Sequence, residues 1–245
     1  FLNMSKNINK LGKSLRLLLV APPGGGKGTV INKLINNNTS YIKDKTKNLN
    51  IISSGNILRN YKDSEDLKKY ITSGALVPDN VITTLILKEI EKLDLTIKDK
   101  ENKITIFDGF PRTLTQFYFT KDNVSKDKYI NMIIEMAVPH ELIIDRCCSR
   151  YIHLKSGRTY NLKYNPPKKE GLDDVTGEPL IQRDDDKVET VTKRLEDYKE
   201  KLQEMREFID NECKDGVLEY HKVDGETSDI NYAKIDQILT NYFEK

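Results

Sequence analysis

The fold of this chain is decided by the stretch Leu17-Leu-Leu-Val-Ala21-Pro-Pro-Gly24-Gly-Gly-Lys27-Gly-Thr29-Val-Ile31. Its first five residues are an apolar run that predicts a buried strand, which has to stop at the two prolines. After the glycines, apolar residues recur at helical spacing. Strand, glycine-rich loop and helix in this order predict a phosphate-binding P-loop, because backbone N–H groups and the helix N-terminus converge there on an anion. An ordinary glycine-rich turn is the alternative.

The predicted P-loop assigns a role to each polar side chain in it. Lys27 is expected to neutralise the β- and γ-phosphate oxygens, and the Thr29 hydroxyl to ligate Mg²⁺. The stretch departs from the usual pattern at Ala21, where glycine is expected, and at Gly28, which separates the lysine from the threonine. A positive φ at Ala21 would cost about 1–2 kcal/mol. The residues expected to cradle the phosphates are Gly24, Gly25, Gly26, Lys27, Gly28 and Thr29.

Length and composition exclude several classes of protein. The 245 residues can form one large domain or a core with inserted lobes. Forty basic and 38 acidic residues leave a net charge of +2, which carries no nucleic-acid signature. The apolar runs are shorter than the ~20 residues of a membrane span. The three cysteines form no C-x-x-C pair, which opposes a zinc site or a disulfide framework and fits a reducing compartment.

The amino-terminal part of the chain is basic. Residues 1–43 contain seven Lys and Arg side chains and neither Asp nor Glu. Two interpretations stay open for residues 1–14, a remnant of a mitochondrial targeting sequence or a solvated arm. The expected location is therefore the mitochondrial matrix or the cytoplasm.

Five apolar runs predict strands, at 17–21, 51–52, 104–107, within 129–138 and at 217–223. Helical patterns alternate with them, which indicates a parallel α/β sheet covered by helices. One helix is expected to begin with Asp79 as its N-cap. Another should run from Pro139 through Arg150, so that Arg146 and Arg150 share one helix face. Residues 151–186 contain few aliphatic side chains and predict a small surface lobe.

Three motifs follow predicted strands and should meet at one crevice, because ligands of such sheets bind beyond the carboxyl ends of the strands. They are the P-loop, Ser53-Ser54-Gly55 and Asp108-Gly-Phe-Pro-Arg112. Arginines accompany them at Arg146, Arg150, Arg183 and Arg194. Each alone reads as a surface charge, but arginine is suited to gripping phosphate. With a P-loop they predict a site that holds two mutually repelling polyphosphates.

These motifs resemble the adenylate kinase family of the long-lid type. The resemblance runs from about residue 15 to the C-terminus and also includes Gly74-Ala-Leu-Val77-Pro and Gly177-Glu-Pro-Leu-Ile-Gln-Arg183-Asp-Asp-Asp. In detail the chain is most similar to the family's mitochondrial GTP:AMP phosphotransferase branch. The resemblance implies a P-loop NTPase fold with a five-stranded sheet and a reversible, Mg²⁺-dependent phosphoryl transfer from a nucleoside triphosphate to AMP. GTP is the expected donor and ATP the alternative, and the enzyme is expected to act as a monomer.

The resemblance also implies roles for individual residues. Lys27 would follow the transferring phosphoryl group, and Asp108 would hold Mg²⁺ through water. AMP would lie against residues of several segments, with two arginines on its phosphate, and the remaining arginines would surround the transferring group. Asp185 and Asp186 would position neighbouring arginines. The residues are Ser54, Gly55, Arg59, Val77, Gly109, Arg112 and Gln116 for AMP; Arg146, Arg150, Arg183 and Arg194 for the transferring group; and Thr159 and Tyr160 for further nucleotide contacts.

The expected division of the chain follows from the same resemblance. Residues 15–52, 78–148 and 187–245 would form the core, 53–77 the AMP-binding lobe and 149–186 a lid, after an arm of residues 1–14. Some relatives hold the lid with four cysteines around zinc, and the matching positions here are His153, Ser156, Asp173 and Thr176. Because Ser and Thr are poor zinc ligands, a hydrogen-bonded polar cluster without zinc is expected.

Two other classes of protein are alternatives to a kinase. A P-loop GTP-binding switch would require an N-K-x-D motif, but Asn32-Lys33-Leu-Ile lacks the aspartate and lies in the first predicted helix. A nucleic-acid-binding domain is opposed by the balanced charge. Dependence of triphosphate consumption on AMP separates a kinase from a switch.

Overall fold

A computed structural model of the chain describes residues 12–60, 67, 70, 77–93, 101–182 and 186–245. Its centre is a five-stranded parallel sheet in the order β2-β3-β1-β4-β7. This confirms the predicted sheet. The bounds are β1 (Ser14–Val20), β2 (Leu49–Ser53), β3 (Lys103–Asp108), β4 (Met132–Ala137) and β7 (Glu219–Asp224), so that β1 begins one residue inside the predicted arm.

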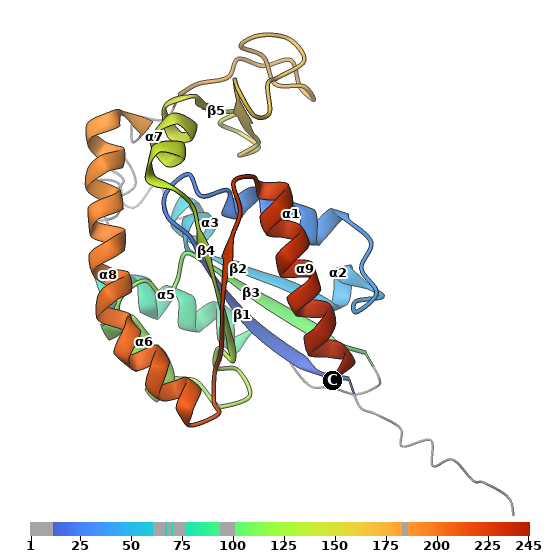
Figure 1. The fold of residues 1–245 in the computed structure, drawn as a ribbon, viewed down its shortest axis with the longest axis vertical. Helices are drawn as coiled ribbons and strands as arrows, with labels where there is room; N and C mark the ends of the chain where they lie inside the picture. Colours follow the sequence, from blue (N-terminus) through green and yellow to red (C-terminus); the bar gives the residue numbers. More distant parts are fainter. Residues whose placement is uncertain (1–11, 61–66, 68–69, 71–76, 94–100, 183–185) are drawn as a thin grey trace, which may run out of the picture.

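Helices cover both faces of the sheet (Figure 1). On one face lie α1 (Lys27–Asn36), the short α2 (Lys45–Asn48) and α9 (Ser228–Glu244). The other face carries α3 (Ser54–Asn60), α5 (Asp79–Glu91), α6 (Leu114–Asn123) and the long α8 (Val188–Lys214). The helix α7 (His140–Cys148) packs against α8 near the carboxyl end of β4. Much of the segment 53–77, expected to form the AMP-binding lobe, lies outside the described residues.

The apolar run of β1 is buried on both sides. Leu15, Leu17 and Leu19 enter the cluster beneath α1 and α9, whereas Leu18 and Val20 enter the cluster beneath α5, α6 and α8. Successive strand residues point to opposite faces, so only a continuous apolar run can sit at the centre of a sheet covered on both sides. This burial places the P-loop, which follows Val20, at the centre of the carboxyl edge.

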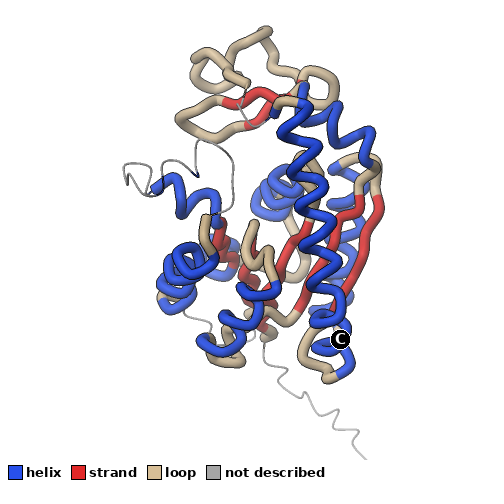
Figure 2. Tube along the Cα trace, turned by 90° about the vertical axis from the view of Figure 1, so that its left-hand side faces the viewer, coloured by secondary structure: helices blue, strands red, loops and turns tan. Residues whose placement is uncertain are grey.

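A smaller unit stands beyond this edge. Two short antiparallel strands, β5 (Arg150–Ile152) and β6 (Thr159–Asn161), and the turns after them lie apart from the main sheet (Figures 1 and 2). This unit begins at Arg150, one residue before the segment 151–186 that was predicted to be a surface lobe. The chain enters it from α7 and leaves it into α8.

The predicted helix from Pro139 through Arg150 is too long. The helix ends at Cys148, and Arg150 already pairs with Asn161 in the small sheet. The Ser149 hydroxyl donates to the carbonyl of Asp145, a local bond by which serine competes with helix continuation. Arg146 and Arg150 therefore do not share one helix face.

The predicted N-cap of α5 is also wrong. Pro78 occupies the cap position, and Asp79 is the first helical residue. Proline suits the boundary because its φ is close to helical values and it needs no N–H partner. The Asp79 carboxylate is instead bound by side chains of α6 and its cap, Thr113.

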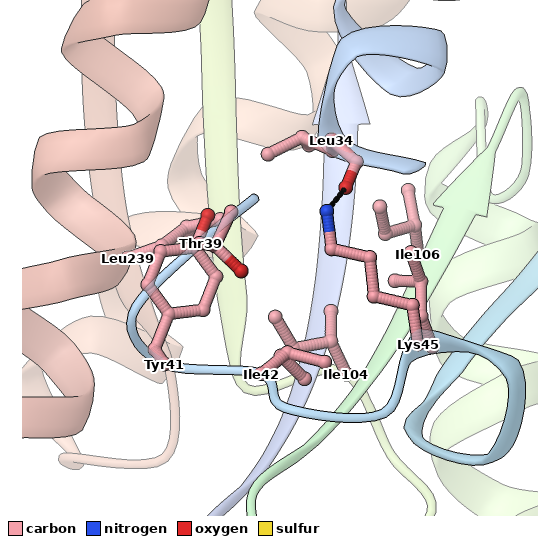
Figure 3. Close-up of a pocket in the computed structure, with 9 residues that line it drawn as sticks. Leu34, Thr39, Tyr41, Ile42, Lys45, Ile104, Ile106 and Leu239 are labelled. Carbon is pink, nitrogen blue, oxygen red and sulfur yellow. Dashed lines mark hydrogen bonds between the residues drawn. The ribbon is translucent and has the colours of Figure 1, made fainter. Parts of the chain in front are cut away.

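A small apolar cavity lies toward the amino ends of β2 and β3, at the opposite end of the sheet from the P-loop (Figure 3). Leu34, Tyr41 and Ile104 line it, and Lys45 Nζ closes one side by donating to the carbonyl of Leu34 at 2.6 Å. Across the described ranges, no helix combines the length and the apolar character needed to cross a membrane.

Candidate active site

The P-loop leaves the N-terminus of α1 open. Gly24 and Gly26 have φ values of 69° and 82°, in the left-handed region that favours glycine. Gly26 caps the helix without a side-chain hydrogen bond, and the first turn contains no acidic residue. The helix start therefore offers N–H groups and its positive end to an anion. Within the described chain no residue other than glycine has a positive φ, so the strain considered at Ala21 does not arise.

Lys27 and Asp108 meet at this loop. Lys27 Nζ lies 2.9 Å from Asp108 Oδ1, and the Ser53 hydroxyl donates to Asp108 Oδ2 at 3.0 Å. Burial lowers the pKa of Lys27, although Asp108 opposes the shift. Burial alone would raise the pKa of Asp108, but Lys27, Ser53 and Arg112 outweigh it and lower that pKa. Since this pKa lies below the ordinary carboxyl value of about 3.9, Asp108 is ionised at neutral pH, and the stability that its ionised form contributes is lost as the pH falls into the acidic range.

Arg112 is held beside the same carboxylate. Its Nε donates to the carbonyl of Gly109 at 2.6 Å, and the Ser54 hydroxyl donates to that carbonyl at 2.9 Å. Partial desolvation lowers the pKa of Arg112, Asp108 opposes the shift, and the charge of Arg194 adds to it. Gly109 has a φ of 78°, and a Cβ there would lie 2.5 Å from Arg112 Nη2. The glycine thus lets the guanidinium lie against the backbone.

Arg150 and Arg194 also lie toward the P-loop. The Arg150 guanidinium forms two hydrogen bonds with Asp186, one of them from Nε to Oδ2 at 2.8 Å. Arg150, Asp186 and Arg194 all influence the thiol of Cys147 electrostatically. That thiol packs so closely on Gly24 that a Cβ on the glycine would overlap it. Arg150 and Arg194 therefore lie near the same loop as Lys27.

Arg146 reaches the P-loop by another route. It donates to the carbonyl of Glu226 and lies over the ring of Tyr164, 5.3 Å from its centroid. Glu226 precedes Ser228, whose hydroxyl a Cβ on Gly26 would overlap. The Arg146 backbone thus belongs to α7, while its side chain contacts both the loop after β7 and Tyr164 of the small unit that follows α7.

The residues predicted for AMP follow β2 and β3 or flank α5. Ser54 and Gly55 begin α3, Val77 is buried just before α5, and Gln116 is buried in α6. The Gln116 amide accepts from the Arg112 N–H at 2.7 Å and donates to Asp79 at 2.6 Å. The side chain of Arg59 and all of Arg183 and Asp185 lie outside the described residues.

The four lid positions that match the zinc ligands of some relatives form the expected hydrogen-bonded cluster. Asp173 is at its centre and accepts from Thr176 Oγ1 at 2.9 Å, while His153 Nδ1 lies 2.7 Å from Ser156 Oγ. Arg158 grips the Asp173 carboxylate with two bonds, which lower the pKa of this carboxyl far below its usual range. The Tyr160 hydroxyl also donates to Asp173, at 2.8 Å.

The two predicted nucleotide contacts of the lid differ in their surroundings. Tyr160 is buried in the cluster, whereas Thr159 is exposed at the start of β6. Their roles toward a nucleotide stay predictions.

Comparison with known proteins identifies this arrangement. The family model described as adenylate kinase matches residues 19–214. The chain belongs to the adenylate kinase family. It is therefore a nucleoside monophosphate kinase, which transfers phosphoryl groups between nucleotides.

Two yeast relatives match the chain over almost its whole length. Both carry the name "GTP:AMP phosphotransferase, mitochondrial". One, from Saccharomyces cerevisiae, is 40% identical over 245 residues and covers 98% of both chains. The other, from S. cerevisiae strain ATCC 204508 / S288c, is 41% identical over 232 residues, which are 92% of this chain and 96% of the relative.

The glycines of this kinase's P-loop are expected to differ in their tolerance of a side chain. Gly24→Ala should lower the Tm by several degrees, because a positive φ costs about 1–2 kcal/mol and each kcal/mol corresponds to about 2–4 °C at this size. Overlap with Cys147 adds to the loss. Gly28→Ala is the matched control, since a Cβ there meets no atom within 4 Å and alanine favours a helix. Thermal unfolding by circular dichroism measures both, and equal Tm values would contradict the explanation.

Sequence patterns missed several residues of the site. Ser53 belongs to one of the predicted motifs without a predicted role of its own, yet its hydroxyl donates to Asp108. Cys147 contacts Gly24 of the P-loop from more than a hundred residues away in the sequence, and Glu226 contacts Arg146 across 80 residues. Of these residues, only Ser53 could have been recognised from the sequence, because it lies at the end of a predicted strand. Contacts between elements far apart in the chain produce no local sequence pattern.

Proposed function

We propose that this enzyme transfers the γ-phosphoryl group of GTP to AMP, reversibly and with Mg²⁺, forming GDP and ADP. The observation that carries the proposal is the junction of Lys27, Asp108 and Arg112 at the carboxyl edge of the sheet. This junction connects the P-loop, which is suited to a triphosphate, with the loop after β3, which leads to Gln116 in α6. GTP as the donor is supported by the names of the two yeast relatives.

Each cation of the site would bind a different part of the two nucleotides' phosphates. When a triphosphate occupies the open start of α1, Lys27 would turn from Asp108 to its β- and γ-oxygens. Arg112 would bind the phosphate of AMP, and Arg146, Arg150, Arg183 and Arg194 would surround the group in transfer. Such placement overcomes the repulsion between two anions and holds the reacting oxygens in line.

The donor set beside the P-loop fits Mg²⁺. The Asp108 carboxylate and the exposed Thr29 hydroxyl are hard oxygen groups, which Mg²⁺ prefers, often through water. Asp108 would hold the ion through water and Thr29 directly. When bound with the nucleotide, Mg²⁺ neutralises charge that develops on the phosphate oxygens.

The segment after α7 would act as a lid. Arg150 and Asp186 pair where the chain enters and leaves this segment, and the cluster around Asp173 makes its interior a hydrogen-bonded unit. Closure of such a unit would expel water, which otherwise accepts the phosphoryl group. Residues 53–77 would form the AMP-binding lobe. We further propose a monomer located in the mitochondrial matrix, in line with the mitochondrial names of the relatives.

A steady-state assay tests this function. Purified protein with Mg²⁺, AMP and either GTP, ITP or ATP should form the nucleoside diphosphate and ADP in equal amounts, with the highest kcat/KM for GTP. A higher value for ATP would favour an ATP:AMP kinase instead. Slow triphosphate hydrolysis that is independent of AMP would point to a GTP-binding switch and contradict the proposal.

A further inference from the structure

We propose that Asp79 is a positioning residue that orients the Gln116 amide and thereby makes the acceptor site selective for adenine over guanine or hypoxanthine. The inference rests on the proposed function, in which AMP is the acceptor and Gln116 contacts it. Asp79 begins α5, directly after the segment expected to form the AMP-binding lobe, and Gln116 lies in the first turn of α6. These two helices pack against each other (Figure 1).

Each polar atom of the amide is paired with a group of fixed character. Gln116 Nε2 donates to Asp79 Oδ1 at 2.6 Å, and the backbone N–H of Arg112 donates to Gln116 Oε1 at 2.7 Å. A carboxylate only accepts and a backbone N–H only donates. If the amide turned over, its oxygen would face the Asp79 carboxylate and its NH₂ would face the N–H of Arg112. Both contacts would be repulsive, so one orientation is fixed.

Helix capping explains only half of this arrangement. Thr113 caps α6 by accepting from the N–H of Gln116 at 3.2 Å, and the Gln116 oxygen returns to the backbone just before the cap. A glutamate at this position would serve such a reciprocal cap equally well. Of the hydrogen bonds described, only the one to Asp79 involves the amide nitrogen of Gln116. The second oxygen of Asp79 accepts from the Thr113 hydroxyl at 2.8 Å, which holds the carboxylate itself in place.

The fixed amide matches the edge of adenine. The bonds described use one of the two Nε2 protons and one of the two lone pairs of Oε1. The remaining proton and lone pair form an adjacent donor and acceptor. Adenine presents an amino group beside a ring-nitrogen acceptor, which is complementary to that pair, whereas guanine and hypoxanthine present an oxygen beside an N–H. To bind guanine or hypoxanthine, the Gln116 amide would have to turn over, and Asp79 and Arg112 prevent this.

The location agrees with an acceptor base. Val77, which the family resemblance assigns to AMP through its backbone, is two residues before Asp79 and buried. Arg112, assigned to the AMP phosphate, is the backbone donor to Gln116. The phosphate-binding and base-binding elements of the acceptor site are thus joined through a single amide.

Asp79→Asn tests the inference, because asparagine carries a donor and an acceptor and so accommodates both amide orientations. Initial rates with AMP, IMP and GMP at a fixed GTP concentration should show the AMP:IMP ratio of kcat/KM reduced about 10-fold or more, the discrimination typical of a bidentate amide contact. The change should appear in KM for AMP, while kcat stays within about twofold. Asp79→Ser is a second variant should the asparagine variant melt well below the wild type.

Two controls separate positioning from a loss of stability. Glu141→Gln removes an exposed acidic residue from the first turn of α7 and should leave the AMP:IMP ratio unchanged. In a Gln116→Ala background, Asp79→Asn should change the ratio less than about twofold, because the residue acts through the amide.

The outcomes distinguish this inference from the proposed function. An unchanged ratio in Asp79→Asn, or an equal further loss in the Gln116→Ala background, would overturn the role of Asp79 while leaving the kinase intact. A wild-type protein that does not phosphorylate AMP would overturn the proposed function and this inference together.

Discussion

Lys27→Met is expected to lower kcat by about 10³-fold or more, within the range that single cations contribute to phosphoryl transfer. Methionine keeps most of the length of the side chain but removes the ammonium that now lies 2.9 Å from Asp108. Binding of the triphosphate should weaken less than turnover, because the P-loop backbone and the start of α1 remain. Single-turnover kinetics with GTP and AMP measure the chemical step apart from binding.

The matched control lies on the same helix. Lys33 pairs with Asp229 at 2.5 Å on the outer side of α1. Lys33→Met should leave kcat within about twofold, since surface ion pairs of this kind contribute little to stability. A folded Lys27→Met protein with near-normal turnover would remove this residue from the mechanism.

Arg112→Ala is expected to cause a loss of similar size, about 10³-fold in kcat/KM for AMP, because it removes the charge assigned to the AMP phosphate. Arg112→Lys should recover only part of it. Lysine restores the charge but not the planar fork, in which Nε binds Gly109 while the outer nitrogens remain for phosphate. Both variants are compared with the wild type through kcat and KM for AMP, measured at saturating GTP.

Arg16 provides the control for this pair. It lies in the amino-terminal half of β1, at the far end of the sheet, where its Nε donates to the carbonyl of Tyr129. Arg16→Lys should keep kcat within about twofold. If Arg112→Ala turned over AMP as well as Arg16→Lys does, the acceptor phosphate would have to bind elsewhere.

The parts of the site that could be predicted lie in short segments. The P-loop is one continuous stretch, and its glycines, lysine and following helix are visible as a local pattern. The carboxyl ends of β2 and β3 could also be predicted from the sequence, because each apolar run is followed directly by a polar motif. Parallel strands then bring Ser53 and Asp108 into register without further information.

The errors came from positions where a tertiary contact outweighed local preference. Aspartate is a common N-cap residue, but the Asp79 carboxylate instead accepts hydrogen bonds from Gln116 of α6 and from Thr113, the cap of that helix. Arg150 was predicted to continue the preceding helix, yet it pairs with Asn161 in the two-stranded sheet of β5 and β6. In both cases the partner lies at least ten residues away, beyond the reach of periodicity.

The sequence by itself determined that this chain forms a parallel sheet with a P-loop at its centre, because burial on both faces demands an apolar strand and an open helix start demands glycines. The tertiary structure alone decided how the charges are shared. Lys27 meets Asp108, Arg150 meets Asp186, and the Gln116 amide is turned by Asp79. The reason is that hydrogen bonds and charge pairs act over a few ångströms in space, and only the packed fold determines which side chains come that close.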